Sequence, residues 1–133
     1  MEVIDDPEVN KKEVDTIAFC SGKVYYDILE QKEKQGIGEN IAVVRLEQLY
    51  PLPLNQIKEI IKGYSKNAKL IWVQEEPENM GAWTYVLRSM REMNFEVIAP
   101  AASASPAAGS PKVHERRHLD MIQRLLNHSK VKA

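Results

Sequence analysis

The sequence contains little cysteine and no long apolar run. Its 133 residues include a single cysteine, Cys20, which cannot form an internal disulfide, so nothing indicates an oxidising compartment. Residues 1–15 are polar and acidic and lack an apolar signal core. No stretch approaches the roughly 20 apolar residues of a membrane span. We therefore expect a cytoplasmic protein without a membrane partner.

An excess of charge of one sign is also missing. Lys plus Arg number 18 and Asp plus Glu number 19, which gives a net charge of -1. Charge alone therefore indicates no nucleic-acid partner. The length suits a single core. We expect one α/β domain over residues 16–128, after a polar lead (1–15) and before a frayed tail (129–133).

Short apolar segments alternate with segments of helical periodicity. The predicted strands are 16–20, 41–46, 69–74 and 95–98, and the predicted helices are 23–35, 53–64, 83–90 and 111–126. This alternation predicts βαβ units and a mainly parallel sheet with helices on both faces. Residues 2–5 are a candidate for a short additional edge strand.

The unusual polar stretches all follow predicted strands. They are residues 21–23, 45–48 and 74–76, together with the Ala/Ser/Pro-rich loop 99–111. The carboxyl ends of parallel strands meet at one edge of a sheet, where such folds bind ligands. We therefore expect the functional groups to gather at that edge.

Three carboxylates, Glu75, Glu76 and Glu78, precede Asn79 and a predicted helix. Acidic residues and an Asn cap stabilise a helix N-terminus, so capping is one interpretation and a partner interface is another. Catalysis or metal binding is less favoured, because no histidine is near in sequence and no H-x-x-x-H spacing occurs.

Other candidate groups have simple structural explanations. Cys20 is expected to be a small buried hydrophobe rather than a nucleophile, and "CSGK" only loosely resembles a phosphate loop. His114 and His118 have the i,i+4 spacing of a helical metal pair, but their Lys and Arg neighbours favour a solvated basic face. No metal site is predicted.

Three sequence blocks together resemble a known family. They are "FCSGKVYYDILE" (19–30), "VRLEQLYPLP" (44–53) with "WVQEEPENMGAW" (72–83), and "ASASPAAGSPKVH" (102–114). Their order and spacing resemble the C-terminal domain of the first, decarboxylating component of the 2-oxoglutarate dehydrogenase complex, in the transketolase superfamily. The resemblance implies a three-layer α/β/α fold with about five strands, mostly parallel, and one antiparallel edge strand.

The resemblance also implies the parent reaction, in which 2-oxoglutarate is decarboxylated and the succinyl group passes to a lipoyl group. Thiamine diphosphate and magnesium would be held by upstream domains, so we expect no cofactor and no catalytic residue in this chain. The expected partners are those upstream domains, a second copy of the full-length enzyme, and the lipoyl succinyltransferase. The residues expected to dock against neighbouring domains are Arg45, Gln74, Glu75, Glu76, Asn79 and Trp83.

An anion site is expected where the small-residue loop meets the last helix, because free N–H groups at a helix start attract negative charge. Its candidate residues are Ser103, Ser105, Ser110, Lys112 and His114. A phosphate or a nucleotide effector would fit. The simpler alternative is that Ser110 only caps its own helix. A second argument against the site is that Pro100 replaces the Arg that is usual at this position in the family.

Two alternatives stay open. The chain could be a free-standing α/β adaptor or nucleotide-sensing module, or the equivalent domain of another transketolase-like enzyme such as a pyruvate dehydrogenase. The block "QEEPENMGAW" (74–83) favours 2-oxoglutarate dehydrogenase over another transketolase-like enzyme.

We predict that the isolated chain neither binds thiamine diphosphate nor decarboxylates 2-oxoglutarate, because its sequence contains no diphosphate-binding motif. Isothermal titration calorimetry with thiamine diphosphate and magnesium checks this. Magnesium-dependent binding in the micromolar range would contradict it.

Overall fold

A computed structural model describes residues 3–7, 9–47, 53–76, 86, 88, 93–99 and 111–127, and in the last range it describes side chains from His118 onward. The elements are β1 (Val3–Ile4), the 3-10 turn η1 (Lys11–Glu13), β2 (Thr16–Cys20), α1 (Lys23–Gln35), β3 (Ile41–Leu46), α2 (Leu54–Lys62), β4 (Lys69–Val73), β5 (Phe95–Ile98) and α4 (Pro111–Leu126). The predicted helix 83–90 lies mostly outside the described residues. None of the helices in the described ranges is long and apolar enough to cross a bilayer.

The five strands form one sheet in the order β1-β3-β2-β4-β5. Strands β2 to β5 pair in parallel, and β1 pairs antiparallel with the edge of β3. The predicted fold class, including the antiparallel edge strand, is confirmed. Because β3 and β4 flank β2 on opposite sides, right-handed crossovers put α1 and α2 on opposite faces of the sheet.

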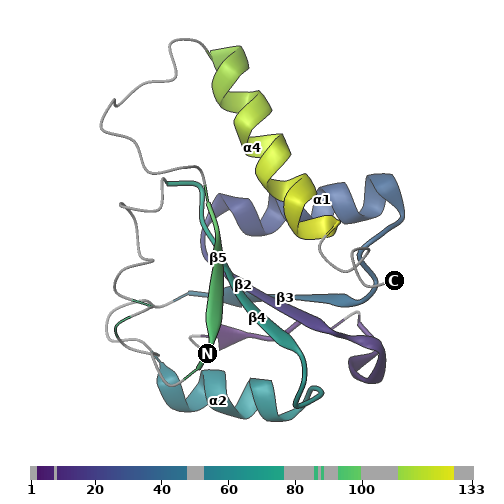
Figure 1. Ribbon diagram of the computed structural model, residues 1–133, viewed down its shortest axis with the longest axis vertical. Coiled ribbons are helices and arrows are strands. Elements are labelled where there is room, and N and C mark those ends of the chain that lie inside the picture. The colour runs from purple at the N-terminus through teal and green to yellow at the C-terminus, as the bar shows by residue number, and fades with distance from the viewer. Residues whose placement is uncertain are drawn as a thin grey trace.

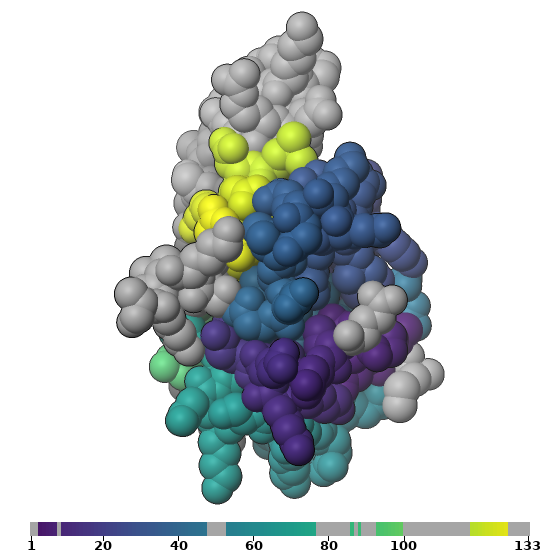
Figure 2. Space-filling view, turned by 90° about the vertical axis from the view of Figure 1, so that its right-hand side faces the viewer, coloured from purple at the N-terminus to yellow at the C-terminus, as the bar shows by residue number. Residues whose placement is uncertain are grey.

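Helices cover both faces of the sheet, which gives three layers (Figure 1). α2 packs on one face against a cluster that includes Phe19, Val44 and Trp72. α1 and α4 share the other face, where they cover Ala18, Cys20 and other strand residues. In Figure 2 the yellow C-terminal part of α4 lies against the blue α1. Every residue of β2 is buried, as expected for a parallel strand covered on both sides.

The N-terminal lead packs onto the domain. Val3 and Val14 are buried in the α2-side cluster. The Asp6 carboxylate is also buried, and its Oδ2 accepts a hydrogen bond of 3.0 Å from the backbone N–H of Val43 in β3. Lys32 Nζ lies 3.9 Å from the same oxygen, which supplies a partly buried counter-charge. The lead therefore closes the β3 side of the sheet.

α1 ends as its sequence predicts. Gly36 adopts the left-handed conformation with φ 62, and its N–H donates to the carbonyl oxygen of Lys32. Glycine adopts this conformation without the steric penalty that a Cβ would bring. The chain then turns directly into β3.

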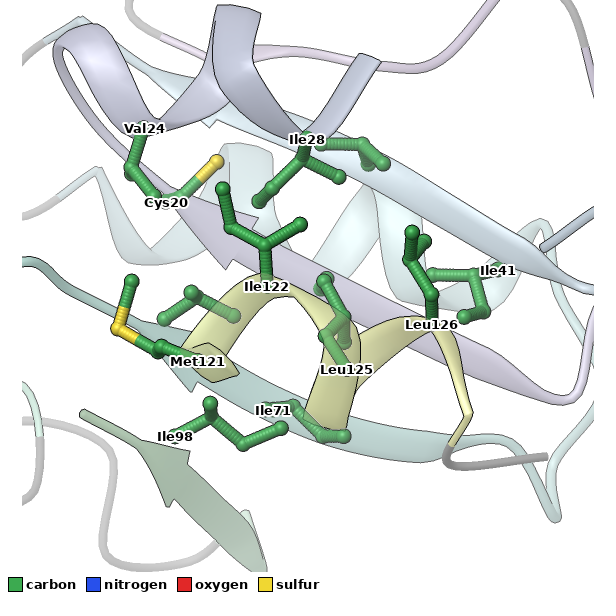
Figure 3. Packing of buried hydrophobic residues seen from close by; sticks show 13 residues of the cluster. Cys20, Val24, Ile28, Ile41, Ile71, Ile98, Met121, Ile122, Leu125 and Leu126 are labelled. Carbon is green, nitrogen blue, oxygen red and sulfur yellow. The ribbon is translucent and has the colours of Figure 1, made fainter. Parts of the chain in front are cut away.

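The packing of α4 generates a stability prediction. Ile122 is fully buried between α1 and the sheet, near Cys20 and Ile28 (Figure 3). Ile122→Ala should lower the free energy of unfolding by about 2–5 kcal/mol, because it removes apolar contacts and leaves a cavity. Urea denaturation measures this loss.

Leu119→Ala is the matched control on the same helix, since Leu119 is 44% exposed. It should change stability by no more than about 0.5 kcal/mol. Equal losses in the two variants would mean that α4 does not pack through the face that contains Ile122.

Candidate functional site

The carboxyl ends of β2 and β4 form the centre of the candidate site. The two strands are neighbours, with Phe19 opposite Trp72. The chain leaves β2 toward β3 on one side and leaves β4 toward β5 on the other. Such a reversal opens a crevice between the strand ends, and open α/β sheets commonly bind ligands there.

Gln74 anchors the chain as it leaves β4. Its side chain is buried, and its Oε1 accepts a hydrogen bond of 2.9 Å from the indole Nε1 of Trp72. Its Nε2 donates to the carbonyl oxygen of Glu76 at 3.0 Å, and its backbone N–H donates to the carbonyl oxygen of Ile98 at 3.2 Å. These bonds fix the backbone on both sides of Glu75.

Glu75 faces the side of the sheet that α1 and α4 cover. Ile71 and Val73 point to that face, and strand alternation carries Glu75 to the same side. There it meets Asp27 of α1 and His118 of α4. One ligand-type atom from each of these three side chains lies within 4.8 Å of the other two.

Asp27 is the best-paired member of this group. Its Oδ2 lies 2.7 Å from His118 Nε2 and accepts a hydrogen bond of 2.9 Å from Lys23 Nζ. Partial burial opposes ionisation of Asp27, but the hydrogen bonds and charges of Lys23 and His118 outweigh it and lower the pKa of its carboxyl group. Asp27 is therefore a carboxylate at neutral pH.

The Glu75 carboxylate has an oxygen without a hydrogen-bond partner in the described part of the chain, unlike the paired Oδ2 of Asp27. Its Oε1 is shielded from solvent and has no hydrogen-bond partner among the residues that the structure describes. The neighbouring Glu76 is exposed. The two glutamates therefore differ: the Glu75 side chain lies near Asp27 of α1 and His118 of α4, and the Glu76 side chain faces solvent.

Arg45 lies at the same edge of the sheet, next to the last residue of β3. Its Nη1 donates to the Tyr26 hydroxyl at 2.7 Å, and its guanidinium carbon is 5.1 Å from the Tyr26 ring centroid and 5.5 Å from that of Tyr25. Stacking of this kind holds an arginine in place through cation–π attraction. Glu47 pairs with it at 3.3 Å. Tyr26 is half-exposed, so a held cation and an aromatic ring face outward together.

The structure brings four of the predicted interface residues to one edge, namely Arg45, Gln74, Glu75 and Glu76. Whether a partner contacts them stays a prediction. The predicted residues outside the described parts of the chain are Asn79, Trp83, Ser103, Ser105 and Ser110. Lys112 and His114 belong to α4, but their side chains are not among those described. The anion site therefore also stays a prediction.

One interpretation from the sequence is wrong. His118 is not on a solvated face, because its side chain is only 16% exposed and lies against Asp27. A signal for this was present: position 118 precedes the buried residues Met121 and Ile122 by three and four positions, which puts it on the same helical face. Asp27 was missed because its i,i+4 spacing from Lys23 is typical of a solvated helix pair.

The interpretation of Cys20 as a buried small hydrophobe is confirmed. Its side chain is fully buried, and its Sγ lies 3.8 Å from the carbonyl oxygen of Val44. Burial raises the pKa of the Cys20 thiol to about 12, although the nearby Arg45 opposes the shift. The thiolate required of a nucleophile is therefore not formed at neutral pH.

The fold falls in the class of transketolase-like α/β domains. A solved structure described as a split-gene transketolase, an inactive beta4 tetramer, matches 87% of this chain and 41% of its own chain, with a TM-score of 0.52 and 17% sequence identity. The chain belongs to the family described as 2-oxoglutarate dehydrogenase C-terminal, which matches residues 1–126.

Curated relatives extend this match. The 2-oxoglutarate dehydrogenase E1 component of Rickettsia felis is 38% identical over 130 residues, which is 90% of this chain and 13% of that protein. The protein of the same name from Azotobacter vinelandii is 38% identical over 128 residues, covering 88% and 14%. The 2-oxoadipate dehydrogenase complex component E1 of Mus musculus is 35% identical over 126 residues, covering 92% and 14%. The chain thus spans a small fraction of each relative.

The burial of Cys20 generates a chemical prediction. In the native chain the thiol should resist a disulfide reagent such as Ellman's reagent at pH 8, and it should react completely within minutes in denaturing urea, where its pKa returns to about 8.5. The absorbance of the released thiolate follows the reaction. Rapid native labelling at the rate of a free thiol would show that Cys20 is accessible.

Proposed function

We propose that this chain is the C-terminal domain of the first, decarboxylating component of a thiamine-diphosphate-dependent 2-oxoglutarate dehydrogenase, where it serves in assembly. The observation that carries the proposal is the family match across residues 1–126, combined with relatives named as E1 components. In the full-length enzyme the reaction is the decarboxylation of 2-oxoglutarate and the transfer of the succinyl group to a lipoyl group.

The side chains described here do not fit thiamine diphosphate and its magnesium ion. Magnesium takes oxygen ligands, often including a cofactor's own phosphates. In the described ranges the only group of three potential metal ligands includes His118, and its members come from α1, α4 and the turn after β4. We assign the cofactor to the upstream domains, and this chain carries no step of the catalysis.

The domain's contribution is a rigid docking edge. Gln74 fixes the end of β4 through three hydrogen bonds, and Tyr25 and Tyr26 hold Arg45 at the end of β3. Rigid polar groups at an edge lose little conformational entropy when a neighbouring surface binds. Glu76 and Arg45 present opposite charges there, which suits a neighbouring surface with complementary charge. The expected neighbours are the cofactor-binding domains and, through the dimer, a second subunit.

The substrate is assigned at the level of a 2-oxo dicarboxylic acid, with 2-oxoglutarate preferred. Relatives are named for 2-oxoglutarate and for 2-oxoadipate, at similar identity to this chain. The test is to express the full-length protein that carries this domain and to assay both acids with the lipoyl succinyltransferase present. Turnover of neither acid would overturn the proposal and would favour a free-standing adaptor.

The docking role predicts a specific effect of charge reversal. Glu76→Lys in the full-length enzyme should reduce dimer assembly or succinyl transfer by roughly threefold or more, since a like-charge contact at an interface is unfavourable. In the isolated domain the same change should alter stability by no more than about 0.5 kcal/mol, because Glu76 is exposed.

Glu59→Lys is the control, because its side chain is 74% exposed and belongs to α2, on the face of the sheet opposite α1 and α4. It should leave assembly and activity unchanged. Sedimentation velocity and the coupled activity assay report the two quantities. Equal effects of the two substitutions would argue against docking through the carboxyl edge.

A further inference from the structure

We propose that Asp27, Glu75 and His118 form a binding site for a divalent transition-metal ion of the zinc class. The three residues come from α1, from the turn after β4 and from α4, and they meet beside the carboxyl end of β4. Asp27 and His118 are 91 positions apart in the sequence. The inference does not rest on the proposed dehydrogenase role.

The spacing of the three side chains suits a single ion. Zinc binds histidine nitrogen and carboxylate oxygen at about 2.0–2.2 Å, so tetrahedral ligand atoms are separated by roughly 3.4 Å. The candidate ligand atoms here lie within 4.8 Å of one another, and one pair, His118 Nε2 and Asp27 Oδ2, is 2.7 Å apart. The three atoms reach tetrahedral spacing through side-chain movements of about 1 Å. A water molecule would complete the coordination.

The unsatisfied oxygen of Glu75 is an independent indication of a ligand. Buried carboxylate oxygens are normally hydrogen-bonded, because removing them from water without a partner is costly. Glu75 Oε1 is buried without such a partner in the described part of the chain. Asp27 and His118 hydrogen-bond to each other, so each of them has a partner within the protein. Glu75 Oε1 is the atom of the group that lacks a hydrogen-bond donor in the described part of the chain, and a dication would supply it with a partner.

The ligand types select the class of ion. One imidazole nitrogen with two carboxylates suits Zn²⁺ and Co²⁺, whereas Mg²⁺ and Ca²⁺ prefer ligands that are all oxygen. His118 Nε2 is the atom that faces Asp27, so it is also the atom that would bind the ion. The imidazole would act as a neutral ligand and release any proton it carries.

Lys23 competes with the ion. Its ammonium group occupies Asp27 Oδ2 at 2.9 Å, but its side chain is 75% exposed and can turn into solvent. Its displacement costs little, since ion pairs between exposed side chains contribute little to stability. A site of this kind should therefore bind more tightly when the lysine charge is removed. A purely structural ion-pair cluster would gain no metal affinity from that change.

The main experiment titrates the full 133-residue chain with zinc chloride and, separately, with cobalt chloride. We expect one ion per chain by calorimetry, visible cobalt absorption bands of a four-coordinate site, and no displacement by millimolar Mg²⁺. Glu75→Gln and His118→Gln should each weaken zinc binding at least about tenfold, because each removes one of three ligands. Circular dichroism confirms that each variant is folded.

Two substitutions serve as matched controls. Glu30→Gln removes a carboxylate of the same helix as Asp27, but from the exposed pair with Lys34, and should leave zinc binding unchanged. His114→Gln tests the i,i+4 histidine pair on α4, and it should also leave binding unchanged. Loss of binding in His114→Gln with retention in Glu75→Gln would overturn the proposal and assign the ion to the histidine pair.

Lys23→Met provides the gain-of-function test. Removing one positive charge near a dication should tighten zinc binding roughly threefold to tenfold at low salt, and less at high salt. The variant is expected to fold, because Lys23 is exposed and makes only a surface pair. Unchanged or weaker binding in a folded Lys23→Met chain would overturn the proposal, as would the absence of stoichiometric zinc binding by the unaltered chain.

Discussion

The burial of β2 on both faces, together with its pairing on both edges, is the constraint on which the domain depends. All five of its residues are buried, and it pairs with β3 on one side and with β4 on the other. A strand in this position can place no polar side chain in water along its length, and its first residue, the polar Thr16, is itself buried. Polar groups that act on other molecules must therefore come from the ends of the strands.

The same constraint explains how the polar side chains at this edge are supported. The last residues of the strands beside β2, Leu46 and Val73, are apolar and buried, and the polar residues next to them are held by packed side chains. Gln74 is bound to Trp72, and Arg45 rests on two tyrosines. Each polar side chain has an apolar or aromatic support behind it. Such support holds functional groups in place more precisely than a mobile loop does.

Much of the fold could be predicted from the sequence, because local patterns carried the information. The apolar runs became β2, β3, β4 and β5 nearly to the residue, and Gly36 ends α1 as expected. Glu75 could be placed at a sheet edge by counting from the strand. The grouping of Asp27, Glu75 and His118 could not be predicted, because these residues meet only after α1 and α4 pack on the same face. Periodicity assigns a face of a helix to the core, but it does not say which other helix contacts that face.

The interpretation of His118 shows where the sequence argument was incomplete. Its charged neighbours along the chain suggested solvent, whereas its register with Met121 and Ile122 indicated the core. Helical register decides orientation, because a residue's sequence neighbours point in different directions around the helix. The buried carboxylate of Asp6 is a similar case: an acidic lead resembles a solvated tail until its partner, the backbone N–H of Val43, is known.

The hydrogen bond between Asp6 and the backbone of Val43 has a consequence for self-association. β1 contains only two residues, whereas β3 contains six, so part of the β3 margin extends beyond the paired segment. An unpaired strand margin is a template on which a foreign strand can grow, and this is a common route to aggregation. Asp6 occupies the N–H of Val43 with a buried negative charge, and Lys32 donates to the carbonyl oxygen of Ile41 nearby. An added strand would have to displace both side chains and break their hydrogen bonds, so the N-terminal lead disfavours strand addition at this margin.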